Sequence, residues 1–381
     1  MDIYADASAV ERALFDRAAQ TNTPIYAVME LLPLCNMNCD MCYVRLSRQE
    51  MERIGRLRTA DEWLDMARQM RDAGTLFLLL TGGEPLLFPD FRRFYHDLLD
   101  LGMLVTINTN GTLIDEDWAR FFGQYKPRRI NITLYAPDEQ GYENLCHYGA
   151  GYERTINAIR LLREQCVEVR VSLTITRENA PHLPRMIETV RELDAAILTS
   201  GYVMPVTRER SLPFNQQSRL LPEEAASAHL FALSRTMPPQ AYIQSLIQRL
   251  YLVENTPPLD GPLHPNCQAG ACAYMINWQG ELRPCVALST PSIPAFEIGF
   301  AAAWQQLHEQ FTQLVLSSKC AQCRLRPICQ SCAASAISET GSFDGTPEYM
   351  CRHAAQLMRI TIDQLRKLPP PPKPDDALKT E

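Results

Sequence analysis

Three closely spaced cysteines, directly after a predicted buried strand, restrict the fold and chemistry of this chain more than any other feature. Cys35, Cys39 and Cys42 are separated by three and then two residues. Three thiolates on one short loop can hold three irons of a [4Fe–4S] cluster and leave the fourth iron without a protein ligand. A structural zinc ion needs four ligands, and no histidine or fourth cysteine lies nearby. The spacing therefore predicts a cluster with one iron open to a substrate or cofactor.

Disulfides are a poor explanation for the 13 cysteines of this 381-residue chain. The N-terminal segment has acids where a secretion signal would have a basic and then an apolar stretch, and no apolar run approaches the roughly 20 residues of a membrane span. We therefore expect a cytoplasmic protein, in which thiols stay reduced and bind metal. The net charge of -7 provides no overall basic field, which argues against nucleic acid or an anionic membrane as a partner.

Short apolar runs alternate with amphipathic segments over residues 24–203. Six predicted strands, rich in Val, Ile and Leu, cover residues 25–32, 75–81, 103–108, 130–135, 167–175 and 197–203. Helical patterns lie between them at residues 59–73, 90–101, 115–122, 152–163 and 182–193, the first beginning with a Thr59 and Glu62 capping box. Strict alternation predicts an α/β fold with a parallel sheet, whose chemistry lies in the loops at the carboxyl ends of the strands.

Two further motifs follow predicted strands. Thr81-Gly82-Gly83-Glu84-Pro85 comes after the second strand, where two glycines permit close backbone approach and a carboxylate can pair with an ammonium group. Asn108-Thr109-Asn110-Gly111 ends the third strand. Asn-Gly is also an ordinary turn signal, so both a ligand contact and a turn are open readings for Asn110.

The cysteine loop and the glycine motif together resemble the radical S-adenosylmethionine (SAM) enzymes. This resemblance implies a partial (β/α)6 barrel in which an electron from the cluster cleaves SAM to methionine and a 5′-deoxyadenosyl radical. The family usually has an aromatic residue before the third cysteine, whereas this chain has Met41, which can pack on a ring face. On the resemblance, SAM contacts would come from Tyr43, Gly82, Gly83, Glu84, Pro85, Asn110 and Thr133.

A second group of eight cysteines occupies the C-terminal third of the chain: Cys267, Cys272, Cys285, Cys320, Cys323, Cys329, Cys332 and Cys351. Eight thiols make two sets of four. Two structural zinc sites are one reading, because Cys-x2-Cys pairs are typical of them. Two further iron–sulfur clusters are the second interpretation of these eight cysteines, and it suits a chain that is already expected to carry a redox cluster.

The pattern of these eight cysteines resembles the SPASM domain, the auxiliary-cluster extension of radical SAM enzymes that modify peptides or sulfatases. On this resemblance the chain holds three [4Fe–4S] clusters. The first auxiliary set would be Cys267, Cys272, Cys285 and Cys332, and the second Cys320, Cys323, Cys329 and Cys351.

The resemblance implies a maturase of ribosomal peptides that abstracts hydrogen from a peptide residue and gives a crosslink, an oxidised residue or an inverted centre. Sulfatase maturases have an aspartate base directly after the third cysteine of the first auxiliary set, where this chain has Val286. Peptide maturation is therefore the leading hypothesis and sulfatase maturation the alternative. A non-enzymatic, cysteine-rich metal-binding electron carrier is a further alternative, although it would have no use for Gly82-Gly83-Glu84-Pro85.

Such an enzyme implies a peptide substrate and a reducing partner such as ferredoxin or flavodoxin. The 34 residues before Cys35 are too few for a peptide-recognition domain. A separate leader-recognition protein or the barrel itself would then bind the precursor.

Three residues are candidates for catalysis. Cys146, expected in the loop after the fourth strand, could return a hydrogen atom to a substrate radical, or it could be a packing cysteine. Tyr135 and Arg208 lie at or beyond strand ends, and Arg208 could pair with a carboxylate. Cys166, before the fifth strand, is expected in the core.

The predicted organisation has five parts. They are an N-terminal extension (1–23), the radical SAM barrel (24–210), a helical connector (211–260), the SPASM domain (261–355), and the end of a C-terminal helix followed by a disordered proline-rich tail (356–381). The SPASM segment has few apolar runs, so we expect bound metal to contribute its folding free energy.

Overall fold

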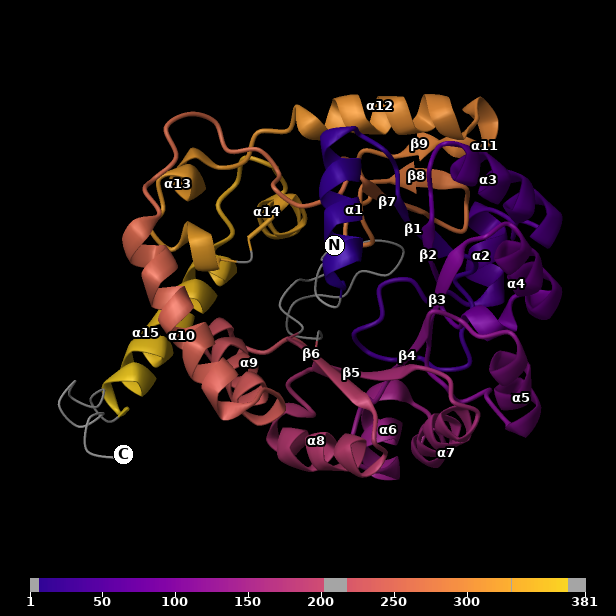
Figure 1. The fold of residues 1–381 in the computed structure, drawn as a ribbon, viewed down its shortest axis with the longest axis horizontal. Coiled ribbons are helices and arrows are strands. Elements are labelled where there is room, and N and C mark those ends of the chain that lie inside the picture. Colours follow the sequence, from indigo (N-terminus) through magenta and orange to yellow (C-terminus); the bar gives the residue numbers. More distant parts are fainter. Residues whose placement is uncertain (1–6, 202–217, 330, 369–381) are drawn as a thin grey trace, which may run out of the picture.

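The computed structural model describes residues 7–201, 218–329 and 331–368 (Figure 1). The predicted disordered tail from residue 369 onward, and Arg208, lie outside these described residues.

A curved parallel sheet with helices on its outer face forms the N-terminal half of the protein (Figure 1). All six predicted strands are present, and each pairs in parallel with the next. They are β1 Tyr26–Glu30, β2 Phe77–Thr81, β3 Leu104–Thr109, β4 Arg129–Thr133, β5 Val169–Ile175 and β6 Ala196–Gly201. The α/β fold class and the partial barrel are confirmed.

The outer helices are α2 Arg48–Ile54, α3 Ala60–Asp72, α4 Phe91–Asp100, α5 Glu116–Gln124, α6 Glu139–Cys146, α7 Gly151–Glu164 and α8 Leu183–Glu192. Five of them agree with the expected pattern, and α2 and α6 are additional. Thr59 caps α3 as predicted, since its hydroxyl accepts from the Glu62 amide at 3.2 Å and the Glu62 carboxylate accepts from the Thr59 amide at 2.8 Å. Trp63 and Met70 of α3 are completely buried against the sheet.

The cysteine-rich segment extends the barrel sheet instead of standing apart from it. Strand β7 (Ala273–Ile276) pairs in parallel with β1, and β8 (Glu281–Arg283) and β9 (Ile293–Pro294) continue the sheet in antiparallel order. Tyr274 and Phe300 are completely buried and belong to the same apolar cluster as the barrel residues, so this segment shares the core of the barrel instead of forming one by itself. Strands β7, β8 and β9 were not predicted, because they have only two to four residues, too few to show an alternating hydrophobic pattern.

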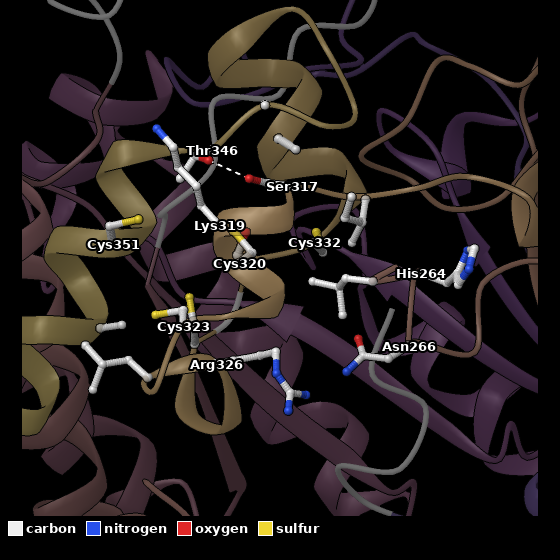
Figure 2. A pocket seen from close by; sticks show the side chains of 18 residues that line it. His264, Asn266, Ser317, Lys319, Cys320, Cys323, Arg326, Cys332, Thr346 and Cys351 are labelled. Carbon is white, nitrogen blue, oxygen red and sulfur yellow. Dashed lines mark hydrogen bonds between the residues drawn. The ribbon is translucent and has the colours of Figure 1, made fainter. Parts of the chain in front are cut away.

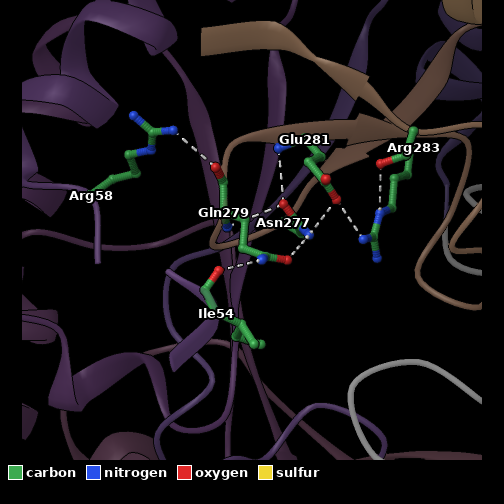
Figure 3. A network of polar contacts seen from close by, with 7 residues as sticks. Ile54, Arg58, Asn277, Gln279, Glu281 and Arg283 are labelled. Carbon is green, nitrogen blue, oxygen red and sulfur yellow. Dashed lines mark hydrogen bonds and ion pairs between the residues drawn. The ribbon is translucent and has the colours of Figure 1, made fainter. Parts of the chain in front are cut away.

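Polar contacts hold the turn between β7 and β8 against the barrel (Figure 3). Within the turn, Asn277 Oδ1 accepts from the Gln279 and Glu281 backbone amides at 3.1 and 2.9 Å. Arg58 donates to the Gln279 carbonyl at 3.0 Å, and the Gln279 amide group donates to the Ile54 carbonyl at 3.2 Å. The turn is therefore fixed to the segment that joins α2 and α3.

Helix α1 (Ala9–Gln20) lies at the amino ends of the strands. The Phe15 ring contacts Tyr26 and Phe77, the first residues of β1 and β2, with centroids 6.4 and 5.1 Å away. Glu11 forms an ion pair with Arg128 at 2.7 Å. The N-terminal extension therefore packs against the end of the sheet that is opposite the cysteine loop.

Further helices complete the C-terminal half. They are α9 Pro222–Thr236, α10 Pro239–Asn255, α11 Ala295–Ile298, α12 Phe300–Thr312, α13 Ser318–Ala321, α14 Ala333–Thr340 and α15 Glu348–Arg366. Helix α15 packs against α9 and α10 and passes through residue 355, where the sequence analysis drew a boundary (Figure 1). None of the described helices is long and apolar enough to cross a membrane.

Candidate active site

A cavity of about 340 Å³ lies at the carboxyl ends of β1 to β5. The loop after β1 brings the three cysteines to its wall, and the loops after the next strands supply polar groups. The lining residues are Cys35, Met37, Cys39, Met41, Cys42, Tyr43, Val44, Thr81, Gly82, Gly83, Asn108, Thr109, Asn110, Thr133, Tyr135 and Thr174. Most of the residues predicted to bind the cluster and the cofactor therefore meet at one place.

The thiols of the first cysteine loop suit a metal centre. Burial raises the pKa of Cys35 to about 12, and the nearby Glu84 carboxylate adds to the effect. The pKa of Cys39 is also well above its ordinary value, because its thiol is hydrogen-bonded to Cys146 and is buried. A metal ion must therefore displace these protons when it binds the thiols.

Nitrogen donors already point at the cysteine sulfurs. The Met37 amide donates to Cys35 Sγ at 3.4 Å, and the Arg45 amide donates to Cys42 Sγ at 3.3 Å. Asn110 Nδ2 lies 3.7 Å from Cys35 Sγ. Hydrogen bonds to the sulfurs are one of the factors that set the potential of a cluster.

The two glycines of the second motif allow the loop after β2 to lie against the loop after β1. The Gly83 amide donates to the Leu32 carbonyl at 2.7 Å, and a Cβ atom on Gly83 would lie 2.2 Å from the Leu34 carbonyl oxygen. Gly82 has a φ of +150°, and a Cβ atom there would lie 2.5 Å from the Leu32 carbonyl oxygen. Only glycine can bring this backbone so close to the chain that enters the cysteine loop.

Glu84 is completely buried behind the glycines and accepts hydrogen bonds from the protein. Its donors are the Thr109 hydroxyl and the Asn110 amide, both at 2.8 Å, and the Leu86 amide at 3.1 Å. Burial raises the pKa of Glu84 to about 7 in spite of these bonds. Among the described residues that line the cavity, this motif contributes Thr81, Gly82 and Gly83 but neither Glu84 nor Pro85.

Asn110 lines the cavity and also organises the cysteine loop. Its Nδ2 donates to Asn36 Oδ1 at 2.9 Å, and its Oδ1 accepts from the Thr112 hydroxyl at 2.7 Å. Asn36 Nδ2 in turn donates to the Thr112 hydroxyl at 2.7 Å. Asn36 and Thr112 were not predicted, because nothing in the sequence around either residue indicates that they meet.

Tyr135 and Cys146, two of the three candidates for catalysis, lie among the residues that the structure describes. Tyr135 lines the cavity, and burial raises the pKa of its hydroxyl. Cys146 is the last residue of α6 and completely buried, so the expected loop position is wrong. Cys166, expected in the core, is exposed at a left-handed position with φ 54°, because it lies in the turn between α7 and β5.

The end of α6 supports the first cysteine loop. The Asn38 and Asp40 amides donate to the Cys146 and Leu145 carbonyls, both at 3.0 Å. His147 Nε2 lies 2.8 Å from Asp40 Oδ1. Because Cys146 is hydrogen-bonded to Cys39, its thiol faces the cluster loop from within the protein.

The cysteines of the second region form two groups. Cys320, Cys323, Cys329 and Cys351 line a cavity of about 300 Å³ (Figure 2). Burial raises the pKa of Cys329 to about 11, and the three other thiols of this group raise it further. This agrees with the second predicted set.

The other group contains only part of the first predicted set. Burial raises the pKa of Cys285 to about 11, and Cys332 and Cys267 are the nearby thiols that add to the effect. Cys332 also lines the 300 Å³ cavity (Figure 2). Cys272 packs elsewhere, in an apolar cluster with Phe15 of α1.

Comparison with known proteins agrees with this geometry. Residues 29–190 match the family model of the Radical SAM superfamily. The AdoMet-dependent heme synthase of Methanosarcina barkeri is 24% identical over 345 residues, which cover 85% of this chain and 95% of that protein. The antilisterial bacteriocin subtilosin biosynthesis protein AlbA of Bacillus subtilis is 23% identical over 309 residues, covering 78% of this chain and 65% of AlbA.

A solved structure extends the similarity to the cysteine-rich segment. Streptococcus suis SuiB bound to its precursor peptide SuiA superposes with a TM-score of 0.67 at 18% identity, over 92% of this chain and 84% of SuiB. The fold is therefore shared well beyond the barrel. Residues 29–190 carry the radical SAM domain, and the members of this superfamily are enzymes that bind SAM and a [4Fe–4S] cluster.

Proposed function

We propose that this enzyme modifies a peptide substrate by hydrogen abstraction, with one [4Fe–4S] cluster at the SAM site and two auxiliary clusters in the cysteine-rich segment. The 340 Å³ cavity carries the proposal, because it joins three cysteines to a glycine loop and to polar groups from neighbouring strands. When bound, the cluster and SAM supply a 5′-deoxyadenosyl radical that removes a hydrogen atom from carbon.

The residues of the cavity have separate roles in this proposal. Cys35, Cys39 and Cys42 hold the cluster. Gly82 and Gly83 offer their backbone to the methionine part of SAM, while Tyr43, Asn110 and Thr133 contact the rest of the cofactor.

Glu84 is the proposed partner of the SAM ammonium group, with Pro85 shaping the loop beside it. A completely buried carboxylate with a pKa of about 7 gains more than an exposed one from a nearby cation. Its present bonds to Thr109 and Asn110 orient it towards the end of β3.

Several observations support a peptide substrate. AlbA is named for the biosynthesis of a bacteriocin, and SuiB has been solved with its precursor peptide. Val286 occupies the position of the base of sulfatase maturases, so sulfatase maturation is the less favoured alternative. Tyr135 lines the cavity and Cys146 is buried, which supports crosslinking or oxidation over the return of a hydrogen atom by Cys146.

Two auxiliary clusters would suit this outcome, because a substrate radical that becomes a crosslink or an oxidised residue must lose a second electron. Ferredoxin or flavodoxin is the proposed source of the first electron, and a separate leader-recognition protein is a proposed partner. Arg208 keeps its proposed role as a carboxylate partner.

Heme formation is the second candidate function. The heme synthase of Methanosarcina barkeri matches this chain over 95% of its own length, a larger share than AlbA at 65%. The two candidates predict different products from the same radical, so they can be separated directly.

The test is an anaerobic assay of the reconstituted enzyme with SAM, a chemical reductant and the short peptides encoded beside its gene. We expect 5′-deoxyadenosine together with a peptide that has lost two hydrogen atoms, detected by mass spectrometry. A parallel assay supplies iron-porphyrin precursors of heme. Heme formation with no peptide product would overturn the peptide proposal and leave the radical SAM assignment intact.

A further inference from the structure

The second auxiliary group of cysteines lies close to the surface of the protein. Cys351 is exposed, and Cys320, Cys323 and Cys329 are partly exposed. Each of the other two cysteine groups has at least one buried member, such as Cys39 in the SAM-site loop. Because electron transfer slows steeply with distance, a cluster held by the second group would be the easiest of the three for a protein carrier to reach.

Positive charge surrounds this group of cysteines. Lys319 and Arg326 line the same 300 Å³ cavity as the four cysteines, and Arg324 directly follows Cys323 (Figure 2). Residues 310–338 carry these three cations and no carboxylate, although the whole chain has a net charge of -7. Lys319, Arg324 and Arg326 together form what we call the basic surface.

The charges of the basic surface are available to a partner. Lys319 and Arg324 are exposed, and neither forms an ion pair with another residue that the structure describes. Arg326 is partly exposed and donates to the Pro257 carbonyl at 3.2 Å. This oxygen has no net charge, so the bond leaves the positive charge of the guanidinium in place.

The carboxylates near the second group lie on the side of Cys351. Partial burial, neighbouring thiols and the carboxylates of Glu339 and Glu348 raise the pKa of Cys351. The pKa values of Cys320 and Cys329 are raised by burial and by other thiols, and no carboxylate contributes. A carrier that approaches from the side of the basic surface therefore meets positive charge.

We infer that the basic surface is the docking site of an acidic one-electron carrier protein, which exchanges an electron with the cluster of the second auxiliary group. The inference rests on the auxiliary clusters of the proposed function and gives its redox partner a place to bind. In the exchange the reduced carrier loses one electron and the oxidised cluster gains it, with no bond made or broken. Ferredoxins and flavodoxins are acidic, so opposite charge would steer them to this surface, and a redox encounter needs only a small interface.

The first experiment measures the binding of flavodoxin to the reconstituted full chain by isothermal titration calorimetry at low and at high salt. The test variant is Lys319→Glu with Arg324→Glu. The matched control is Arg68→Glu with Arg160→Glu, which changes two exposed arginines on α3 and α7 by the same total charge. We expect Kd at low salt to rise about tenfold in the test variant alone, and the Kd of the wild type to rise with salt. An unchanged Kd in the test variant, or an equal rise in the control, would overturn the inference.

The second experiment compares two electron sources in the peptide assay. With titanium(III) citrate, which needs no docking site, the test variant should make 5′-deoxyadenosine at the wild-type rate. With limiting flavodoxin its rate should fall, and an unchanged rate would overturn the inference. A wild type that gives no peptide product with either electron source would instead contradict the proposed peptide function, while the calorimetry would still decide the docking site.

A variant that adds positive charge keeps the inference testable if the test variant does not fold. Asp260 is exposed beside the basic surface, since the amide of its neighbour Leu259 donates to the Ala321 carbonyl at 3.0 Å. We expect Asp260→Lys to lower the Kd for flavodoxin at low salt, because it replaces a repulsive charge by an attractive one. A Kd that stays the same or rises in this variant would overturn the inference.

Discussion

In the loop after β1, the backbone around the cysteines is hydrogen-bonded to distant parts of the chain, whereas around Cys320, Cys323 and Cys329 most bonds are local. Asn38 and Asp40 donate to the end of α6, more than 100 residues away. The amides of Cys323 and Cys329 donate to residues three positions earlier. The SAM-site loop is thus shaped by the barrel, while the auxiliary segment relies more on its own turns and on metal.

The contrast between long-range hydrogen bonds in the SAM-site loop and local ones in the auxiliary segment fits the different roles proposed for the two regions. A loop that must present one open iron to SAM depends on a fixed geometry, and the contacts with α6 help to fix it. A segment that holds clusters for electron transfer can gain its final order from the clusters themselves.

The largest effect should follow from replacing Cys35, Cys39 and Cys42 together by alanine. We expect 5′-deoxyadenosine production to be abolished and the iron content to fall by about four per chain. Chromatography of the nucleoside and iron analysis provide the two measurements. Cys166→Ala is the matched control, because this exposed cysteine lies outside both cysteine regions and should change neither value.

A large effect is also expected from Gly83→Ala. The added Cβ would lie 2.2 Å from the Leu34 carbonyl oxygen, so the two loops must separate. A misplacement of about 1 Å can cost on the order of 10²-fold in rate, and we expect a loss of this size in SAM cleavage with weaker SAM binding in equilibrium dialysis. Gly102→Ala is the control, since it has positive φ but no atom within 4 Å of the new Cβ. Equal losses in both variants would show that the loop contact is unimportant.

Removal of iron tests the comparison between the two regions directly. In the apo protein we expect amide hydrogen exchange to speed up around residues 317–332, while β1 to β4 and the end of α6 stay protected. The reason is that the barrel amides are held by sheet and tertiary bonds that do not involve metal. Equal loss of protection in both regions would contradict the idea that the barrel shapes the SAM-site loop.

Glu84 should make the apo protein less stable as the pH rises. Its pKa is about 7 in the folded protein and near 4.5 when unfolded, so the folded state binds more protons between these values. The free energy of unfolding should therefore fall by at most about 3 kcal/mol from about pH 5 to above pH 7.

In denaturant titrations of Glu84→Gln at several pH values, the free energy of unfolding should no longer fall between about pH 5 and pH 7, whatever the overall stability of the variant. Glu62→Gln is the matched control, because the ion pair with Arg56 lowers the pKa of Glu62 to about 2. Its pH-dependent contribution lies below the unfolded pKa, so the control should keep the wild-type decline between about pH 5 and pH 7. A decline that persists in Glu84→Gln would rule out Glu84 as its source.

The smallest effect on product is expected for Cys146→Ala. The variant should still make 5′-deoxyadenosine and modified peptide, because Cys146 is buried behind the cluster loop. Loss of its hydrogen bond to Cys39 should shift the potential of the SAM-site cluster to a more negative value in a redox titration. Solvent deuterium at an α-carbon of the wild-type product, absent from the variant, would identify Cys146 as a hydrogen donor and the enzyme as an epimerase.

The order of the six barrel strands, five of the helices between them and the two main loops could be predicted from the sequence, because they depend on local patterns. The strands between residues 25 and 203 show as apolar runs, and Thr59 with Glu62 marks a helix start. The spacing of Cys35, Cys39 and Cys42 and the glycines beside Glu84 likewise carry their chemistry within a few residues.

Only the tertiary structure decided which distant residues meet. Thr112 and Asn110 form hydrogen bonds with Asn36, more than 70 positions earlier in the sequence. The Cys146 thiol is hydrogen-bonded to Cys39, and β7 pairs with β1 although nearly the whole barrel lies between them in the sequence. Cys272 has the sequence neighbours of a cluster ligand, yet its sulfur packs beside α1. The spacing of cysteines along the chain indicates which residues could be ligands. The direction in which each side chain points is set by the strand or helix that its backbone belongs to, and by the packing of that element.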